Sequence, residues 1–93
     1  MEAQNRHPHK NLLAWQTAML LCEMIYKVTT DFPNEEKFGL TSQLRRASVS
    51  VPSNIAEGAA RKSKAEFSHF ISISLGSLSE IDTQLEISKR LGF

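Results

Sequence analysis

The chain has 93 residues, of which 41% are hydrophobic and 23% are charged, and its formal net charge is +1. This composition is typical of one soluble domain near the small end of the range that buries its own core, and it excludes a disordered chain. A single cysteine, Cys22, excludes an internal disulfide framework, and no apolar run approaches the roughly 20 residues that cross a bilayer. We therefore predict a cytoplasmic protein without a membrane-spanning segment.

The opening segment, residues 1–10, is polar and is predicted to be a flexible N-terminal arm. His7 and His9 flank Pro8 in this arm. A metal site needs a closed set of ligands, and two histidines without a third ligand do not supply one. We therefore predict no metal site in this arm. Residues 11–93 are assigned to one helical domain.

A first helix is predicted from about Asn11 to Thr30, because apolar residues recur there at intervals of three and four. The apolar positions form two adjoining rows: Leu12, Trp15, Met19, Cys22 and Tyr26 in one, and Ala14, Ala18, Leu21, Ile25 and Val28 in the other. An ordinary surface helix shows only one such stripe. The pattern therefore indicates either the central helix of a bundle or a helix that also contacts another subunit.

Pro33 ends this helix, and a second helix is predicted from Leu40 or Thr41 to Ala60. Its apolar row is Leu44, Ala47, Val51, Ile55 and Ala59. Pro52 lies inside the helix, where a proline removes an amide donor and crowds a carbonyl at a cost of about 3 kcal/mol. We expect a bend near Pro52 and close packing by a neighbouring helix at Gly58.

A third helix is predicted to begin after Ser63, which forms a capping box with Glu66, and to reach about Leu91, with Gly92 as its C-cap. Its expected core row is Phe67, Ile71, Ser74, Leu78, Ile81 and Leu85. Gly76 lowers helix propensity, so we expect another backbone to pass close to it. No segment alternates as a strand would, and the predicted fold class is all-α.

Polar residues at helical spacing follow one side of the second helix, and others lie in the middle of the third. We predict that they form a structural polar network, comprising Arg46, Ser50, Asn54, Glu57, Ser77 and Glu80. A buried ion pair requires such partners, because one unpaired charge costs about 3–5 kcal/mol. The alternative interpretation is that some of these side chains face a ligand.

Between Arg45 and Lys64 the chain carries five basic residues and one acid, Glu57. Four of the five are candidates for contacts with nucleic-acid phosphates: Arg45, Arg61, Lys62 and Lys64. The alternative is an ordinary solvated surface. This segment lacks aromatic residues for base stacking, so binding would use the backbone or shape of the nucleic acid.

Catalytic patterns are missing from the sequence. It contains no glycine-rich phosphate loop, no paired metal-ligand spacing and no nucleophile elbow. We therefore predict that the protein is not an enzyme and uses no cofactor.

Several short segments together make a specific pattern: Lys10-Asn11-Leu12 with Trp15 and Ala18, Ile25-Tyr26, Phe32-Pro33, Gly39-Leu40, Gln43 to Arg46, Ser50 to Gly58, Glu66-Phe67 with Phe70, Gly76 to Glu80, and Leu91-Gly92-Phe93. In these segments the chain resembles the four-helix-bundle proteins encoded in intervening sequences of bacterial 23S ribosomal RNA genes. The run Ser-Val-Pro-Ser-Asn-Ile-Ala-Glu-Gly, from Ser50 to Gly58, is the most specific part.

The resemblance implies an up-and-down helical bundle similar to the accessory variability determinant of diversity-generating retroelements. Known relatives assemble as ring-like homopentamers, and the retroelement relative works with a reverse transcriptase and nucleic acid. Members ordinarily continue into a fourth helix beyond the point that matches Phe93, so we expect about three helices and a groove that favours association. The matching residues are expected to define bundle and subunit contacts first.

The leading hypothesis is a non-enzymatic, self-assembling bundle that offers a basic surface to RNA. The runner-up is a structural module that docks a protein, such as a polymerase, through apolar surfaces. A third interpretation is a nonfunctional remnant of a mobile element.

Overall fold

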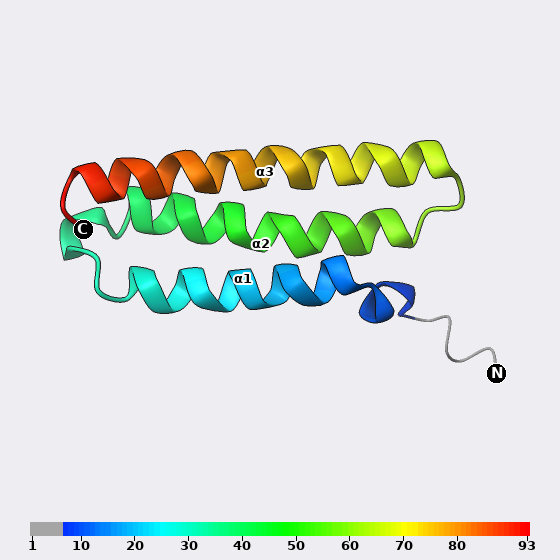
Figure 1. Ribbon diagram of the computed structural model, residues 1–93, viewed down its shortest axis with the longest axis horizontal. Helices are drawn as coiled ribbons and strands as arrows, with labels where there is room; N and C mark the ends of the chain where they lie inside the picture. Colours follow the sequence, from blue (N-terminus) through cyan, green and yellow to red (C-terminus); the bar gives the residue numbers. More distant parts are fainter. Residues whose placement is uncertain (1–6) are drawn as a thin grey trace.

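The computed structural model describes residues 7–93, which form three long α-helices and two short 3-10 helices (Figure 1). The long helices are α1 (Leu13–Thr29), α2 (Leu40–Ala59) and α3 (Lys64–Arg90), and the short ones are η2 (Pro8–Asn11) and η3 (Asn34–Glu36). Successive long helices run in opposite directions, and residues 7–93 contain no strand. The predicted all-α, up-and-down bundle is confirmed, with three helices present.

Part of the segment that was predicted to be a flexible arm forms a short helix. Residues 1–6 lie outside the described residues, whereas residues 8–10 belong to η2, which packs against α2. Pro8 occupies the start of this turn, where its fixed φ suits a helix and its missing amide hydrogen costs nothing. Gln16 of α1 donates a hydrogen bond from Nε2 to the Lys10 carbonyl at 2.9 Å.

Local sequence signals explain how α3 begins and ends. The Ser63 Oγ accepts a hydrogen bond from the Glu66 amide at 3.1 Å, which satisfies one of the free donors at the helix start. At the other end, Gly92 has a φ of +85°. The Gly92 amide donates to the Lys89 carbonyl at 3.1 Å, and the Phe93 amide donates to the Ser88 carbonyl at 2.9 Å, as in a Schellman motif. Both predicted ends of this helix are confirmed.

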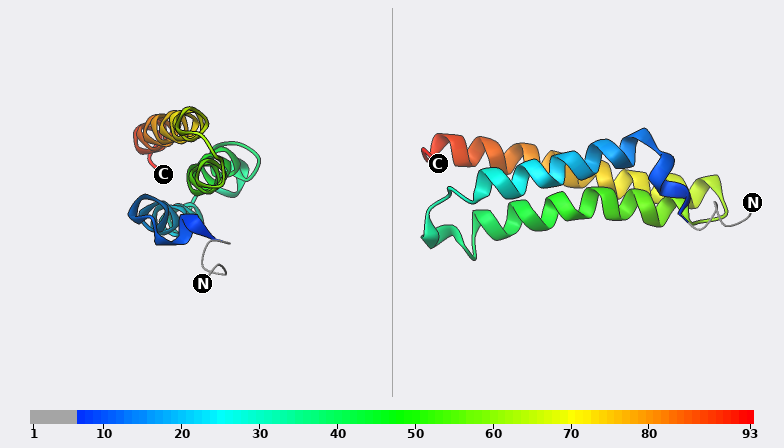
Figure 2. Two further views of the ribbon diagram at one scale, coloured as in Figure 1. Left: turned by 90° about the vertical axis from the view of Figure 1, so that its right-hand side faces the viewer. Right: turned by 90° about the horizontal axis from the view of Figure 1, so that it is seen from below.

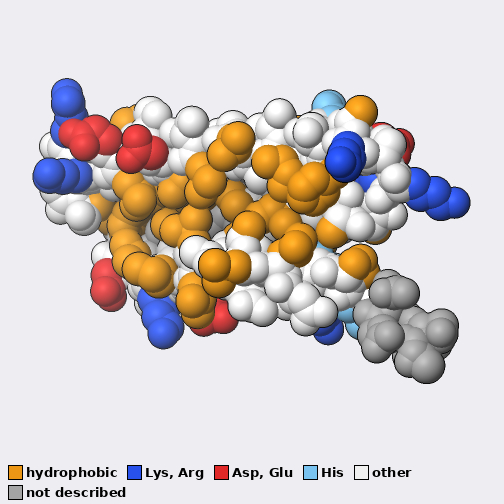
Figure 3. All heavy atoms as spheres, turned by 45° about the vertical axis from the view of Figure 1, so that its right-hand side comes forward, with side chains coloured by type: hydrophobic (Ala, Val, Ile, Leu, Met, Phe, Trp, Pro, Cys, Tyr) orange, Lys and Arg blue, Asp and Glu red, His pale blue; other side chains and the backbone are white. Residues whose placement is uncertain are grey.

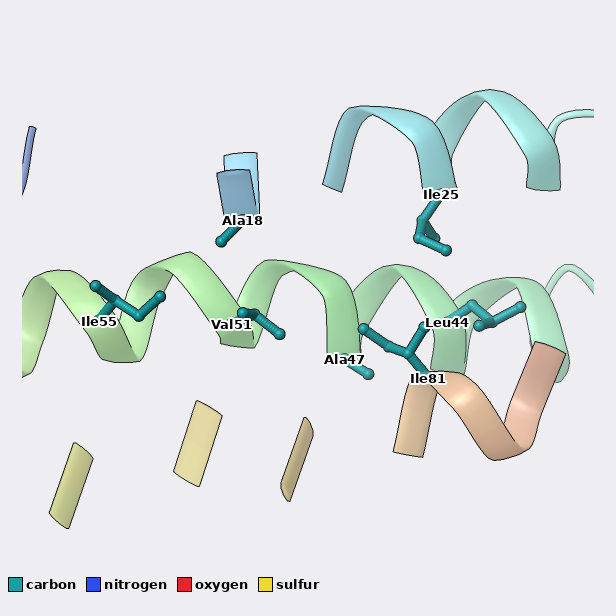
Figure 4. Close-up of a cluster of buried hydrophobic side chains, with 7 residues drawn as sticks. All are labelled: Ala18, Ile25, Leu44, Ala47, Val51, Ile55 and Ile81. Carbon is teal, nitrogen blue, oxygen red and sulfur yellow. The ribbon is translucent and has the colours of Figure 1, made fainter. Parts of the chain in front are cut away.

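The core is centred on α2, which packs against both α1 and α3 (Figures 1 and 2). Its buried apolar side chains lie in one row, as predicted: Leu44, Ala47, Val51 and Ile55. Ala18 and Ile25 reach this row from α1, and Ile81 reaches it from α3 (Figure 4). The chain continues as a helix through Pro52, which is itself buried. A bend at that residue stays a prediction.

The predicted core row of α3 is wrong in part, because the face turned toward α2 is mostly polar. Its buried residues are Ser74, Ser77, Ile81, Gln84 and Ser88. Hydrogen bonds make this burial possible, because the Ser74 Oγ donates to the Val51 carbonyl at 2.9 Å and the Ser77 Oγ bonds the Ser50 Oγ at 2.9 Å. Small serines also let the two helices approach closely. Phe67, Leu78 and Leu85 consequently remain more than a third exposed.

An apolar groove lies between α1 and α3. These two helices lie on the same side of α2 and have at most a weak contact with each other (Figure 2). The groove has a volume of about 470 Å³. Its lining includes Leu13, Leu21, Ile71, Leu75 and Leu78, with Val51 and Ile55 of α2 at its floor. Hydrophobic side chains cover this face of the molecule between the two helices (Figure 3).

Gly58 and Gly76 were both expected to lie where another helix passes close, but their surroundings differ. A Cβ at Gly58 would lie 2.9 Å from the Phe70 Cβ and 3.3 Å from the Phe67 carbonyl oxygen, so α3 passes directly against this position. A Cβ at Gly76 would meet no atom within 4 Å in the described part of the chain. The expected close neighbour of Gly76 is therefore absent among residues 7–93, because this residue faces away from α2.

These environments predict opposite effects of the same substitution. Gly58→Ala should lower the free energy of unfolding by about 1–3 kcal/mol, because the added methyl group overpacks the contact with α3. Gly76→Ala should raise the free energy of unfolding by up to about 1 kcal/mol, because it improves helix propensity on an exposed face. Urea unfolding followed by circular dichroism would measure both. Equal effects of the two substitutions would contradict this packing.

Candidate nucleic-acid interface

The connection between α2 and α3 concentrates positive charge in a few residues. Arg61 and Lys62 lie in the connection, and Lys64 is the first residue of α3. We call these three residues the basic loop. All three are exposed, at the end of the bundle where η2 also lies. Because Ser63 caps α3 at this point, the cations stand at a helix N-terminus, where the free amide groups also favour anions.

The three cations of the basic loop have different environments. Arg61 forms an ion pair with Glu57, with Nη2 and Oε2 at 2.7 Å, and its Cζ lies 4.9 Å from the centre of the Phe70 ring. Neither Lys62 nor Lys64 forms an ion pair with another residue of the described range. Arg61 is thus held in place, whereas the two lysines have their charges directed to solvent.

Two hollows flank Arg61. The first, which we call the loop hollow, has a volume of about 340 Å³. Its apolar lining is Pro8, Leu12, Gly58, Ala59 and Phe67, and its polar lining is Arg61, Lys62, Ser63 and Lys64. The second hollow has a volume of about 440 Å³ and is lined by Arg61, Ala65, Glu66, His69 and Phe70.

Two aromatic side chains lie beside the basic loop, although the segment from Arg45 to Lys64 itself contains none. Phe67 and Phe70 follow the basic cluster in the sequence, outside the range from Arg45 to Lys64. Once α3 begins at Lys64, the helical period returns both rings to the end of the bundle beside Arg61. The spacing of these phenylalanines after the Ser63 cap was the signal that would have found them.

Arg45 does not belong to this cluster. It precedes Arg61 by sixteen residues, which is about 24 Å along an α-helix at roughly 1.5 Å per residue. Its Nε donates to the Thr29 Oγ1 at 2.9 Å, and its Nη2 donates to the Tyr26 carbonyl at 3.2 Å. Its Cζ also lies 4.6 Å from the centre of the Tyr26 ring. These contacts tie α2 to the end of α1 and give Arg45 a structural role.

The residues of the predicted polar network do not form one connected set, and hydrogen bonds join them in two separate groups. Asn54 donates from Nδ2 to the carbonyl oxygen of Ser50 at 2.8 Å and to its Oγ at 3.0 Å, and Ser50 in turn contacts Ser77. Glu80 joins a separate group through Gln84, whose Nε2 lies 3.3 Å from the Glu80 Oε2. That Nε2 also donates to the Gln43 Oε1 at 3.1 Å, a partner that the sequence did not suggest.

Two members of the predicted network lie outside both groups. Glu57 is exposed and pairs with Arg61, and Arg46 is exposed without an ion pair among residues 7–93. The expected buried pairing of Arg46 and Glu57 with Ser77 and Glu80 is therefore wrong. The reason is that charged side chains remain solvated at the edge of the α2–α3 seam, while serine, asparagine and glutamine occupy its interior.

The histidines of the N-terminal segment have an aromatic environment. The His9 ring packs edge-on against Trp15, with ring centres 5.0 Å apart. The part of the chain that the structure describes contains no group of three or more histidine, cysteine, aspartate or glutamate residues placed to hold a metal ion.

Arg45 and its neighbour Arg46 provide a matched test of this assignment. Arg45→Gln should lower the free energy of unfolding by about 1–2 kcal/mol, because it removes charge-assisted hydrogen bonds to α1. Arg46→Gln should change the free energy of unfolding by less than about 0.5 kcal/mol, as expected of an exposed surface substitution. Thermal and urea unfolding would measure the difference, and similar stabilities of the two variants would contradict the structural role of Arg45.

Comparison with known proteins identifies one family for this chain. Residues 10–93 match the model of one family, described as the 23S rRNA-intervening sequence protein. A comparison with curated proteins finds no match. Within the described residues, every helix is too short or too polar to cross a membrane. Because the family match extends over most of the sequence, the chain belongs to the 23S rRNA-intervening sequence protein family.

Proposed function

We propose that this protein is a non-enzymatic, self-assembling helical bundle that binds RNA or another nucleic acid through the basic loop. The observation that carries the proposal is the exposed pair Lys62 and Lys64, which have no ion pairs among residues 7–93 and stand beside Arg61. Cations that are free to contact phosphates release counterions from a nucleic acid, which is the main source of sequence-independent affinity. The family description names a ribosomal RNA insertion, so structured RNA is the first ligand to test.

The charge at the opposite end of the bundle supports the choice of this loop. There Arg90 forms an ion pair with Glu86, in which Nε and Oε2 are 3.0 Å apart. The Lys37 Nζ lies over the Phe38 ring, 5.6 Å from the ring centre. Positive and negative side chains are mixed at that end, including Asp31, Glu35 and Glu36. A polyanion would meet repulsion there as well as attraction, so the basic loop is the better docking point.

Changing the basic loop should weaken RNA binding and its dependence on salt. In the triple variant Arg61→Gln, Lys62→Gln and Lys64→Gln, affinity for a labelled structured RNA should fall at least tenfold at low salt. The slope of log K against log salt concentration should become shallower by about 2, because each lost phosphate contact contributes roughly 0.7–0.9. Fluorescence anisotropy at several salt concentrations would measure both quantities.

The matched control carries the same change of charge at the far end: Lys27→Gln, Lys37→Gln and Lys89→Gln. It should retain most of the affinity. Lys27 is in the last turn of α1, Lys37 follows η3 and Lys89 is in the last turn of α3, and these segments lie at the end of the bundle opposite the basic loop (Figure 1). An equal loss of affinity in both triple variants would assign binding to net charge alone. A wild-type protein whose RNA binding does not respond to salt would contradict the proposal itself.

Self-assembly is supported by the apolar groove between α1 and α3. Leu13 and Leu75, on opposite sides of the groove, are 76% and 57% exposed. Leu20 and Met24 extend the exposed apolar side of α1 and are 59% and 61% exposed. A continuous apolar surface of this kind marks an interaction site.

The occupant that we propose is α1 of a second copy. This helix carries only two charged residues, Glu23 and Lys27, and both lie on its narrow polar strip. It can therefore enter a groove without burying an unpaired charge, which would be costly. Each copy supplies both an apolar helix and a groove, as a self-complementary contact requires.

Light scattering at micromolar concentration should show an oligomer. Combining Leu13→Gln with Leu75→Gln should weaken assembly roughly tenfold or more, since burying one leucine side chain contributes about 1.5–3 kcal/mol. Phe38→Gln is the control, because Phe38 is 89% exposed and lies outside the groove. A wild-type monomer would contradict self-assembly and would favour the alternative, a module that docks a partner such as a polymerase through its apolar surface.

A further inference from the structure

The loop hollow combines two chemical surfaces that a simple phosphate site does not need. We call its apolar lining, which includes Phe67, the floor, and the cations of the basic loop the rim. A site for phosphates alone needs only the cations. The exposed aromatic ring beside them suits a ligand that also has a flat apolar group.

We propose that the loop hollow receives one unpaired base of a bound RNA, which stacks on Phe67 while Lys62 and Lys64 contact the adjacent phosphates. This inference rests on the proposed function and specifies its ligand as RNA with a bulged or single-stranded nucleotide. A base has an apolar π-face and is linked through its sugar to anionic phosphates, and the lining of the hollow includes both an aromatic ring and cations. Stacking on aromatic side chains is the usual way in which proteins bind unpaired bases.

The size of the hollow agrees with this ligand. Its volume of about 340 Å³ falls at the lower end of the range of roughly 300–1,000 Å³ found for small-ligand sites. The bases of a continuous duplex are stacked inside the helix and cannot enter such a hollow unless one is displaced. A paired RNA would therefore contact the rim and leave the floor empty.

The position of Phe67 is fixed by the glycine opposite it. A Cβ at Gly58 would lie 3.2 Å from the Phe67 Cδ1, so the ring packs directly on the backbone of α2. The side chain nevertheless keeps 36% of its surface exposed. An aromatic ring that is held on one side and open on the other is a preorganised stacking surface, which lowers the entropic cost of binding.

Arg61 completes the arrangement without needing to move. Its ion pair with Glu57 and its position over the Phe70 ring hold the guanidinium between the two hollows. A positioned guanidinium can itself stack on a base or contact a phosphate. The loop hollow therefore has one fixed cation and two lysines that can adjust to the path of the RNA backbone.

The test compares two labelled hairpin RNAs of equal length and charge, one with a single unpaired purine and one fully paired. The wild-type protein should bind the RNA with the unpaired purine about fivefold to hundredfold more tightly, the range expected when one base stacks on a protein ring. Phe67→Leu should remove this preference while leaving the salt dependence and the affinity for the paired RNA unchanged. Phe67→Tyr should keep the preference, and Phe38→Leu is the control for loss of an exposed phenylalanine elsewhere.

A second measurement uses the wild-type protein alone, in case Phe67→Leu does not fold. A fluorescent purine analogue at the unpaired position should be quenched on binding, and the same analogue at a paired position should not. Salt-sensitive binding without a preference for the unpaired base, or without quenching, would overturn this inference and leave the proposed function standing. Absence of salt-sensitive binding to either RNA would overturn both.

Discussion

The seam between α2 and α3 is built from small and hydroxyl-bearing side chains, and the arrangement of the bundle depends on it. Ser74 donates to the Val51 carbonyl and Ser77 bonds Ser50, so these two hydroxyl groups, which leave water on folding, find partners across the seam. Without those partners each buried hydroxyl would cost about 1–3 kcal/mol. The close approach also determines where the larger apolar side chains of α3 go, which is outward to the groove.

The parts of the fold that sequence patterns predict well are those governed by local chemistry. Ser63 and Gly92 define the ends of α3 because cap geometry depends on neighbouring residues only. The buried row of α2 follows from apolar periodicity. The buried face of α3 was found in this way only at Ser74 and Ile81, because apolar periodicity does not mark Ser77, Gln84 and Ser88 as buried. The burial of Ser77 and Gln84 depends on hydrogen-bond partners in another helix, which a single sequence does not pair.

The same difference between local signals and contacts between helices applies to the candidate interface. Arg61, Lys62 and Lys64 are adjacent in sequence and remain together at one end of the bundle. Arg45 belongs to the same basic segment of the sequence but lies near the start of α2, far from the loop, where Thr29 and Tyr26 accept its hydrogen bonds. Phe67 was missed for the opposite reason, since it lies outside the basic segment and reaches the hollow only when α3 has formed. Contacts between different helices therefore decide which residues of a charge cluster can act together.

The Schellman turn that ends α3 has a consequence for where the space between α1 and α3 is open. It places Phe93 against Phe32, with ring centres 5.6 Å apart, so the residues after α1 and the end of α3 are joined at one end of the molecule. The residues that line the groove lie toward the other end, from Leu13 to Leu21 in α1 and from Ile71 to Leu78 in α3. The aromatic pair therefore closes the space between α1 and α3 at one end, and a guest helix would be seated along the half of the bundle that carries the basic loop.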